Sequence, residues 1–283
     1  MSRLCFAGKT AVITGAASGI GAALAKALAA KGCNLALADI DADGLENVAS
    51  ELRSNTLRIT TSVFDVGDER AINDFASEVR QTHGEAHLLF NNAGVALGGR
   101  FDQISPEQFD WLLNINLHGV VRMTRAFLPL IQEQSEGHIT NISSIFGVIA
   151  PEGQTAYSAA KFGVRGFTMA LRHELMGSST GVTTIHPGGI ATNIAKRAPR
   201  GADVTDAEYE AARKVADTAL VMPPSEAAAI ILRGVERRKS RVFVGRDAHA
   251  LHWIERLLPT RYWSIIKRRL KATDSTNGES RQV

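Results

Sequence analysis

A tyrosine and a lysine four residues apart are the side chains in this sequence best suited to acid–base chemistry. Tyr157 and Lys161 would share one face of a helix, because residues i and i+4 of a helix are neighbours. An ordinary tyrosine has a pKa near ~10 and is a poor base at neutral pH. Lowering that pKa by about three units takes roughly 4 kcal/mol, which one ammonium group at about 4 Å supplies at an effective dielectric constant near 20. The pair therefore predicts a general base whose pKa is lowered by its lysine.

Two further polar residues could complete such a site. Ser144 comes thirteen positions before Tyr157 and just after a predicted strand, so its hydroxyl could bind the oxygen of a substrate. Ser143 is the competing serine, and neighbouring residues of a strand face opposite sides. Asn116 lies inside a predicted helix, where an asparagine is mildly unfavourable because its side chain competes for backbone partners. Asn114 is the alternative asparagine and could simply face solvent.

A cluster of glycines near the start of the chain could bind phosphate. Gly15, Gly19 and Gly21 follow a short apolar run and precede an Ala/Leu-rich stretch, so they are predicted to join a first strand to a first helix. Glycines there allow a tight turn and a close approach of backbone to a pyrophosphate, which the helix N-terminus also attracts. The spacing is G-x(3)-G-x-G, whereas the common dinucleotide fingerprint is G-x-G-x-x-G. A plain structural turn is the alternative, but the place between strand and helix favours a phosphate site.

An acidic residue at the end of the second predicted strand indicates which cofactor the loop would hold. Asp39 lies eighteen residues after Gly21, where a carboxylate can bind a ribose 2′-OH and repel a 2′-phosphate. Neither the glycine loop nor the five residues after Asp39 contain Arg or Lys, which favours NAD over NADP. Asp39 could instead cap the next helix, although Asp41 is better placed to do so. Asp65, at the end of the third strand, could equally meet the adenine or cap a helix.

These residues need a scaffold that brings distant segments together. Strand-like apolar runs alternate with helix-like stretches, which predicts β-α-β units and a parallel sheet buried on both faces. Right-handed crossovers then give an α/β, doubly wound, mostly parallel seven-stranded sheet of the Rossmann type, whose ligands bind beyond the carboxyl ends of the strands. Strands are predicted at 9–15, 34–40, 57–64, 86–90, 138–143, 182–186 and 241–245, and helices at 19–31, 42–54, 68–82, 105–131, 154–176 and 224–238.

The chain is predicted to form a single domain with a C-terminal addition. Because no linker or internal repeat divides it, residues 1–246 are expected to form one NAD-binding catalytic domain. Residues 192–222 interrupt the alternation of strands and helices, and we interpret them as a substrate lid inserted over the site. Residues 247–271 are predicted to be an amphipathic helical extension, and residues 272–283 a disordered tail.

Composition excludes several classes of protein. Of the 283 residues, 45% are apolar and 22% are charged, as in an average globular protein, which excludes extensive disorder, collagen-like repeats and a coiled coil. No apolar run of about 18 residues is present, so no membrane-spanning helix is expected. The first residues lack a long apolar core, so no signal peptide is expected. Only Cys5 and Cys33 are present, which indicates a reducing compartment, and a cytoplasmic location is predicted.

Positive charge is concentrated near the C-terminus. Residues 237–271 contain eleven Lys or Arg and two Asp or Glu, while the whole chain carries only +3, so residues 1–236 are net acidic. A general nucleic-acid binder would spread basic residues over its body, so nucleic acid is not an expected partner. Residues 249–270 combine cations with Trp, Tyr, Leu and Ile, and Pro259 would divide them into two short helices. Such a segment could lie on a membrane surface, pack on its own subunit or contact another subunit.

Taken in order, these motifs resemble those of the short-chain dehydrogenase/reductase family, in its single-domain branch. The resemblance covers residues 5–246 and implies an NAD-dependent oxidoreductase that acts on CH-OH groups, interconverting a hydrophobic secondary alcohol and its ketone by reversible hydride transfer. An NADPH-dependent carbonyl reductase is the alternative enzyme. The alternative of another class is an NAD-binding scaffold or sensor with a membrane- or partner-docking tail. The motifs are Thr14-Gly15-x(3)-Gly19-x-Gly21, Asn91-Asn92-Ala93-Gly94, Ser144, Tyr157-x(3)-Lys161 and Pro187-Gly188.

The resemblance also implies roles for individual residues. Ser144 would hold the substrate oxygen, Tyr157 would exchange the alcohol proton, and Lys161 would lower the tyrosine pKa and orient the nicotinamide ribose. Asn116 would hold a water molecule that joins the lysine to a proton relay, which completes the catalytic set. A homodimer or homotetramer formed through the long helices is the expected assembly. The cofactor-binding residues would be Gly15, Ser18, Gly19, Ile20, Gly21, Asp39, Asp65, Val66, Asn91, Ala93, Gly94, Tyr157, Lys161, Pro187, Gly188, Ile190 and Thr192.

The substrate pocket is expected to be apolar. No Arg or Lys lies immediately beside Ser144 or Tyr157 to bind a carboxylate. The lid cations Lys196, Arg197 and Arg200 could serve an anionic group, although exposure to solvent is the favoured interpretation. The histidines show no spacing with Cys or carboxylates that is typical of a metal site, so no metal is expected. The residues expected to contact the substrate are Val95, Ala96, Ile145, Phe146 and Gly189.

Overall fold

Strands and helices alternate along the chain within two residues of their predicted bounds, apart from the segments discussed below. A computed structural model describes residues 3–54 and 56–268. The strands are β1 (Thr10–Thr14), β2 (Asn34–Asp39), β3 (Ile59–Val63), β4 (Leu88–Asn91), β5 (Gly137–Ile142), β6 (Thr180–Pro187) and β7 (Arg241–Val244). The helices are α1 (Gly19–Ala29), α2 (Ala42–Leu52), α3 (Glu69–His83), α4 (Pro106–Leu113), α5 (Gly119–Gln132), α6 (Thr155–Glu174), α7 (Asp206–Ala219), α8 (Pro224–Glu236) and α9 (Arg246–Leu257), with short 3-10 turns η1 (Phe101–Gln103) and η3 (Ile145–Gly147).

All seven strands are parallel and lie in the order β3-β2-β1-β4-β5-β6-β7. The chain first builds outward from β1 to β3 and then returns to place β4 on the other side of β1. A doubly wound sheet binds its ligands where the strand order reverses, here beyond the carboxyl ends of β1 and β4. The predicted Rossmann-type class with seven strands is confirmed.

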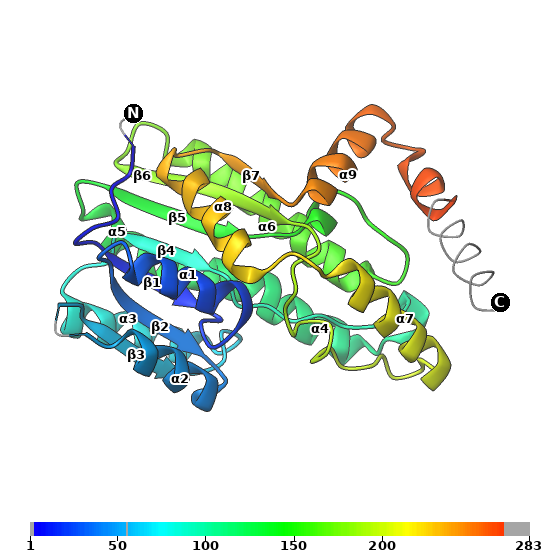
Figure 1. Ribbon diagram of the computed structural model, residues 1–283, viewed down its shortest axis with the longest axis horizontal. Helices are drawn as coiled ribbons and strands as arrows, with labels where there is room; N and C mark the ends of the chain where they lie inside the picture. The colour runs from blue at the N-terminus through cyan, green and yellow to red at the C-terminus, as the bar shows by residue number, and fades with distance from the viewer. Residues whose placement is uncertain (1–2, 55, 269–283) are drawn as a thin grey trace, which may run out of the picture.

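Helices cover both faces of the sheet (Figure 1). On one face α1 and α8 pack together, with Leu24, Leu28 and Ile231 against the apolar side chains of β1 and β2. On the other face α3, α5 and α6 pack around Phe75 and Phe127. Because both faces are covered, β1, β4 and β5 are buried along their whole length, which explains their continuous apolar runs.

The helix predicted over residues 105–131 is not one continuous α-helix. It consists of α4, a π-helical turn (η2, Asn114–His118) and α5, which follow one another without a break. Pro129 lies inside α5 and does not end it. Single π-turns within helices frequently mark functional sites, and this one carries Asn116.

The segment predicted as a lid differs most from expectation, because it contains the helix α7. Thr205 begins this helix through a capping box, in which its hydroxyl accepts the Glu208 N–H and the Glu208 carboxylate accepts the Thr205 N–H. Tyr209 and Ala216, seven residues apart, are half-buried and the other α7 residues are exposed, so this helix packs on the fold through a narrow stripe. The Thr-x-x-Glu spacing is the signal in the sequence that indicates it.

Residues 246–268, here called the extension, form two short helical segments beyond β7. The first is α9, which ends before Pro259, and residues 262–268 are helical again, in agreement with the predicted break. Figure 1 shows α9 beyond the end of the sheet, on the same side as α4 and α7. Across residues 3–54 and 56–268, no helix has the length and apolar character needed to cross a membrane. The tail predicted to be disordered, residues 272–283, lies outside the described residues.

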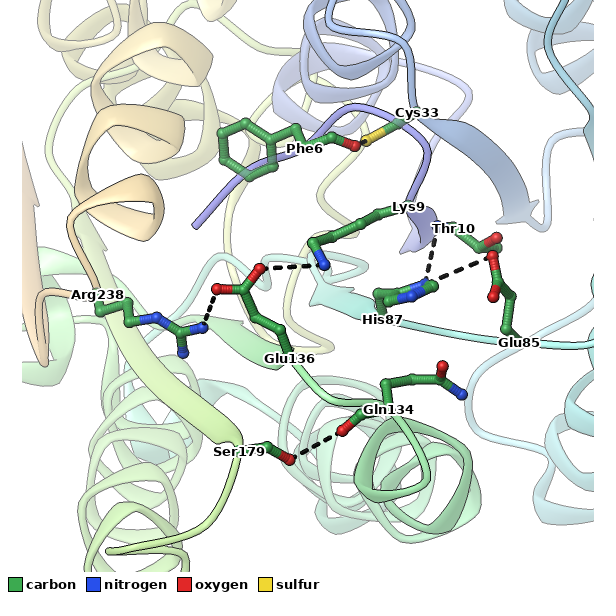
Figure 2. A network of polar contacts seen from close by, with 10 residues as sticks. All are labelled: Phe6, Lys9, Thr10, Cys33, Glu85, His87, Gln134, Glu136, Ser179 and Arg238. Atoms are coloured by element: carbon green, nitrogen blue, oxygen red, sulfur yellow. Dashed lines mark hydrogen bonds and ion pairs between the residues drawn. The ribbon is translucent and has the colours of Figure 1, made fainter. Parts of the chain in front are cut away.

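A network of charges holds the opposite, amino-terminal edge of the sheet (Figure 2). Glu136, just before β5, pairs with Lys9 before β1 at 3.1 Å and with Arg238 before β7 at 2.6 Å. Burial alone would raise the pKa of Glu136, but the bonds to Arg238 and Lys9 outweigh it and hold that pKa below its ordinary value. His87 accepts the Thr10 N–H at 3.2 Å, and burial lowers the pKa of His87. This network therefore supports the sheet far from the ligand-binding edge.

Candidate active site

Helix α6 carries Tyr157 and Lys161 on one face, as their spacing predicts. Lys161 is 3% exposed, and its Nζ lies 5.5 Å from the centroid of the Tyr157 ring. The same Nζ donates a hydrogen bond to the carbonyl of Ile142, the last residue of β5, at 3.1 Å. The pair is therefore fastened to the carboxyl end of a central strand, where this fold class binds its ligands.

The pKa of Tyr157 differs from the sequence-based expectation. Burial raises the pKa of Tyr157 to about 12, and a hydrogen bond with Ser144 lowers it only in part. Burial also lowers the pKa of Lys161 to about 8. Burial therefore outweighs the charge of Lys161, whose ammonium group lies beside the ring and is bonded to Ile142 instead of the phenol oxygen. A phenolate at this position needs a further positive charge next to it.

The two serines after β5 have different environments. The Ser143 hydroxyl donates to the Lys161 carbonyl at 2.8 Å and so faces the backbone of α6. The Ser144 hydroxyl accepts the Phe146 N–H at 3.1 Å and is hydrogen-bonded to Tyr157. Ser144 is therefore the serine beside the tyrosine, whereas Ser143 fastens α6 to the loop.

Asn116 is fully buried and faces the loop after β4. Its side chain exchanges two hydrogen bonds with Val95, since Oδ1 accepts the Val95 N–H and Nδ2 donates to the Val95 carbonyl, each at 2.8 Å. A Cβ atom added to Gly94 would lie 3.1 Å from Asn116 Oδ1 and 3.4 Å from Lys161 Nζ. Gly94 thus allows one turn of backbone to lie against both polar groups, which brings Asn116 near the lysine.

Asn114 is not simply exposed to solvent, which was the expectation for it. Its Nδ2 donates to the Gly67 carbonyl at 3.2 Å, and Arg122 donates to both Asn114 Oδ1 and the same carbonyl. The loop that Asn114 holds begins at Asp65, whose carboxylate accepts the Gly67 N–H at 2.7 Å. Asp68 caps α3, so the alternative role of Asp65 as a helix cap is wrong.

Glycines bring the cofactor loop into contact with its neighbours at the end of β1. Gly15 and Gly19 have φ angles of +67° and +56°, which glycine adopts most readily. A Cβ atom on Gly15 would lie 2.8 Å from Ala93 Cα, and one on Gly21 would overlap the Gly15 carbonyl. Helix α1 begins with Ser18 as N-cap, whose hydroxyl makes no capping bond. The first N–H groups of α1, which have no intrahelical partners, therefore form a cradle of the kind that binds a pyrophosphate.

Asn92 holds this cradle, a role that its sequence motif does not reveal by itself. Its Nδ2 donates to the Thr14 carbonyl at 2.9 Å and to the Gly15 carbonyl at 3.1 Å. In return the Thr14 hydroxyl accepts the N–H groups of Asn92 and Ala93, at 3.0 and 3.1 Å. These bonds fasten the end of β4 to the glycine loop at the point where the strand order reverses.

Asp39 ends β2 beside the glycine loop, and backbone groups fix its carboxylate. Oδ2 accepts the Ala17 N–H at 2.9 Å, and Oδ1 accepts the Asp41 N–H at 3.0 Å. The cap of α2 is Asp41, whose side chain accepts the Gly44 N–H at 3.0 Å. The alternative role of Asp39 as a helix cap is therefore wrong, and its carboxylate is held at the rim of the cradle.

Asn91 belongs to a chain of buried polar groups that joins four elements. Its Nδ2 donates to Thr124 of α5 at 2.9 Å and to Asn141 of β5 at 2.8 Å. Asn141 in turn donates to Thr168 of α6 at 2.9 Å. Asn91 therefore ties the central strands to their covering helices. Val66, also expected at the cofactor site, is 9% exposed in the loop after β3.

The segment after β6 crosses from the sheet to the glycine loop. A Cβ atom on Gly19 would lie 3.0 Å from Thr192 Cγ2, so Thr192 is placed beside the cradle. The Gly189 N–H donates to Asp247 of α9 at 2.7 Å, so this N–H is already paired within the protein. Pro187 is the last residue of β6, and Gly188 and the buried Ile190 lie in the segment that follows it.

The expected substrate residues separate into two groups. Phe146 lies edge-on to Tyr157, with ring centroids 6.2 Å apart and an interplanar angle of 90°. Val95 packs in the same apolar cluster as Tyr157, and its neighbour Ala96 is half-buried. Ile145 is 5% exposed and packs against α9, so the extension covers its side chain. Phe146, Val95 and Ala96 can thus line a pocket at the tyrosine, whereas the side chain of Ile145 packs against α9.

Two of the three cations in the predicted lid form ion pairs. Arg197 reaches Asp41 at the start of α2, with Nη2 and Oδ2 3.0 Å apart, and Arg200 pairs with Asp206. A backbone N–H of α2 and then Arg197 hold the pKa of Asp41 below its ordinary value. Lys196 is exposed, as expected for all three. The Arg197 pair connects the lid to the helix that follows Asp39.

Comparisons with known proteins agree with this geometry. A family model described as short chain dehydrogenase matches residues 9–203, more than half of the chain. The chain belongs to this family. This short-chain dehydrogenase is 40% identical over 265 residues to SadH of Mycobacterium tuberculosis, a protein named as an oxidoreductase, and covers 92% of its own length and 95% of SadH. It is 32% identical over 274 residues to dehydrogenase/reductase SDR family member 7B of Xenopus laevis, covering 94% of its own length and 83% of that protein.

Solved structures show the same relationship. The crystal structure of a short chain dehydrogenase/reductase from Burkholderia phymatum in complex with NAD superposes with a TM-score of 0.83 at 29% identity. The match covers 89% of this chain and 94% of that one. This short-chain dehydrogenase is therefore an oxidoreductase with an NAD(P)-binding Rossmann fold.

The residues of the site fit a dinucleotide. Side chains at Gly15 and Gly21 would clash with neighbouring backbone, so the loop can approach a ligand closely. The N-terminus of α1 faces this loop, and Asp39 lies at its rim. Over residues 3–54 and 56–268, no group of three His, Cys, Asp or Glu side chains could hold a metal ion. The chemical groups brought together at the tyrosine are a phenol, a hydroxyl, an ammonium and an amide, which can move a proton and bind an oxygen atom.

Proposed function

We propose that this short-chain dehydrogenase interconverts a hydrophobic secondary alcohol and its ketone with NAD as the cofactor. The observation that carries the proposal is the grouping of Ser144, Tyr157 and Lys161 at the carboxyl end of β5. Asn116 completes the group from the π-turn, on the other side of Gly94. This set lies next to the glycine cradle because β4 and β5 are adjacent strands.

Each side chain of the group has a distinct task in the oxidation of an alcohol. When bound, the nicotinamide ring supplies the hydride acceptor and a positive charge. Tyr157 takes the hydroxyl proton of the alcohol at its phenol oxygen, and Ser144 holds the substrate oxygen by a hydrogen bond. Lys161, held by the Ile142 carbonyl, keeps its charge against the tyrosine ring. In the reverse direction Tyr157 returns the proton to the ketone oxygen.

Asp39 supports NAD as the preferred cofactor. Two backbone N–H groups hold its carboxylate in place, so a negative charge persists where the 2′-phosphate of NADP would have to lie. The residues proposed to hold the dinucleotide are Gly15, Ser18, Gly19, Ile20, Gly21, Asp39, Asp65, Val66, Asn91, Ala93, Gly94, Tyr157, Lys161, Pro187, Gly188, Ile190 and Thr192.

Apolar side chains beside the tyrosine support a hydrophobic substrate. Phe146 and Val95 adjoin Tyr157, and neither is charged. The lid cations that could bind an anion are exposed, and Arg197 and Arg200 are already paired with carboxylates. A pocket lined by such groups binds an alcohol mainly by burying its hydrocarbon part, with Ser144 and Tyr157 as the polar contacts.

The test is NADH absorbance at alkaline pH over secondary alcohols that range from short aliphatic to steroid-sized, with wild-type enzyme and Tyr157→Phe. We expect turnover with NAD⁺ in the wild type and a loss of about 10²- to 10⁴-fold in the variant, the usual contribution of a general base. Faster turnover with NADP⁺ would instead support the carbonyl reductase. Binding of NAD⁺ without turnover of any alcohol or ketone would support the scaffold.

Exposed apolar side chains on the long helices support a homodimer or homotetramer. Phe162 and Met169, seven residues apart on α6, are 39% and 47% exposed, and Trp111 of the adjacent α4 is 36% exposed. We propose that subunits associate through this face, because aromatic and methionine side chains are enriched in interfaces. Light scattering after size-exclusion chromatography gives the assembly, and Phe162→Glu is expected to shift it to monomer.

The outer face of α9 supports contact with a membrane. Arg246, Trp253, Arg256 and Leu257 are all exposed, and positions 246, 253 and 257 recur on one helical face. We propose that this face docks on anionic lipid headgroups, because cations near such a surface contribute ~1 kcal/mol each while Trp and Leu insert. Sedimentation with vesicles is expected to show binding that requires phosphatidylserine and is weakened by Trp253→Ala. No binding to anionic vesicles would overturn this proposal.

A further inference from the structure

The extension is bonded to both loops that border the proposed substrate pocket. At its start, Asp247 accepts the N–H of Gly189, in the segment after β6, at 2.7 Å. Near its end, the Tyr262 hydroxyl accepts the N–H of Ala150 at 3.0 Å. Ala150 lies in the loop of residues 143–154 between β5 and α6, here called the serine loop. A short C-terminal segment therefore holds two loops that are distant from it in the sequence.

Apolar contacts bury the serine loop beneath the extension. Ile145, Val148 and Ile149 of the loop are each 5% exposed or less. They form one cluster with Ala248, against which Leu251, Tyr262 and Ile266 of the extension also pack. Without the extension three large apolar side chains of the loop would lose this cover, and such side chains are rarely left in water.

A stack of rings reaches from the extension to the backbone of Ser144. The His186 ring donates from Nδ1 to the Ser144 carbonyl at 2.9 Å. It stacks on Phe243 at 5.2 Å between centroids, and Phe243 stacks on His252 of α9 at 4.4 Å. The Arg241 guanidinium lies 4.7 Å from the Phe243 centroid. Burial lowers the pKa of His186 to about 3, so the ring is neutral and keeps its proton on the nitrogen that bonds Ser144.

We propose that the extension is a positioning element of the active site, which holds the serine loop so that Ser144 and Phe146 keep their places beside Tyr157. Phe146 packs in the extension's own apolar cluster while its ring meets Tyr157 edge-on. Tyr262 acts through its hydrogen bond to Ala150 of the loop. His252 acts through Phe243 and His186, which reach the Ser144 carbonyl. This inference rests on the proposed function, because it assigns the substrate side of that same site.

Kinetics of two variants test the positioning role. Tyr262→Phe removes the acceptor for the Ala150 N–H, and His252→Leu ends the ring stack. We expect the substrate KM to rise about 2- to 10-fold in each, the range for one lost contact of this kind, with kcat and the Kd for NAD⁺ nearly unchanged. Leu258→Ala, at an exposed position just after the same helix, is the matched control and is expected to leave all three constants unchanged.

Amide hydrogen exchange tests the same role without turnover. In Tyr262→Phe and His252→Leu we expect faster exchange in residues 143–154, while β1, α1 and β2 keep wild-type rates. Unchanged exchange and KM in both variants would overturn the proposal. Faster exchange across the whole sheet would also overturn it, because the extension would then only stabilise the fold. If the wild type turns over no alcohol but the loop still loosens selectively, the proposed function fails and the positioning role stands.

Discussion

The Lys161 ammonium group lies beside the Tyr157 ring, 5.5 Å from its centroid, and donates its hydrogen bond to the Ile142 carbonyl. It can therefore favour the phenolate through its charge but does not share the phenol proton. Because burial lowers the pKa of Lys161 to about 8, that charge is present below pH 8 and fades above it.

Lys161→Met is expected to lower kcat/KM for alcohol oxidation most strongly below pH 8. The loss there should be about 10²-fold or more, because the variant has no cation to offset the raised pKa of the tyrosine. Above pH 8 the wild-type lysine is itself neutral, so the ratio of wild type to variant should fall as pH rises. A pH–rate profile from pH 6 to 10 measures this ratio, and a constant ratio would contradict the role of the charge.

Asp39→Asn is expected to shift binding towards NADP. The variant keeps the size of the side chain and one carbonyl oxygen for a backbone N–H, but removes the charge that repels a 2′-phosphate. We expect the ratio of Kd for NADPH to Kd for NADH to fall about tenfold or more, which corresponds to about 1.4 kcal/mol. Fluorescence titration measures both constants. Asp43→Asn, an exposed position of α2, is the control and should leave the ratio unchanged.

Gly94→Ala is expected to reduce turnover about tenfold or more with little loss of stability. The added methyl group would lie 3.1 Å from Asn116 Oδ1 and 3.4 Å from Lys161 Nζ, so both groups must move. Gly166→Ala is the matched substitution, because nothing lies within 4 Å of that Cβ position on α6. It should raise the free energy of unfolding by about 0.5–1 kcal/mol and leave activity intact. Equal activity of the two variants would contradict this account of Gly94.

Glu136→Gln is expected to lower the free energy of unfolding by about 2–3 kcal/mol at pH 7, because it leaves Lys9 and Arg238 facing each other with little solvent. Glu133→Gln breaks an exposed pair with Arg80 and should cost about 0–1 kcal/mol.

The difference in unfolding free energy between the wild type and Glu136→Gln is expected to depend on pH, because the pKa of Glu136 is lowered. Its stabilisation is complete above the ordinary carboxyl value of 4.5 and is lost as pH falls through the lower folded value. Urea unfolding at pH 7 and pH 3 should therefore show a gap between wild type and Glu136→Gln that narrows in acid. A gap of the same size at both pH values would contradict the ion-pair explanation.

The centre of the sheet could be predicted from the sequence because β1, β4 and β5 are buried along their whole length and therefore appear as separate apolar runs. The spacing of Tyr157 and Lys161 and the glycine loop are also local patterns. Both could therefore be assigned to the carboxyl ends of the strands, where the structure has them. Helix α7 was not predicted, and in the structure only Tyr209 and Ala216 of its residues are half-buried while the rest are exposed. Only the Thr205 capping box marks it.

Contacts between distant segments were beyond the reach of these patterns. Asn92, His186 and Tyr262 act on backbone groups far from them in the chain, and no spacing rule connects such positions. The burial that raises the pKa of Tyr157 could not be predicted either, because only the packed structure provides it, whereas the lysine charge follows from the spacing of the two residues.

The position of the extension after β7 also orders events during synthesis. Because the N-terminal parts of a chain emerge first, the glycine cradle of β1 and α1 and the residue Asn92 that holds it are made well before the extension. Tyr262 and His252 emerge only after β1 to β7, the strands of residues 3–54 and 56–268, have been made. A nascent dehydrogenase would thus complete its glycine cradle before its serine loop is fastened, and a protein cut short after β7 is expected to keep the cradle while Ile145, Val148 and Ile149 lose their cover.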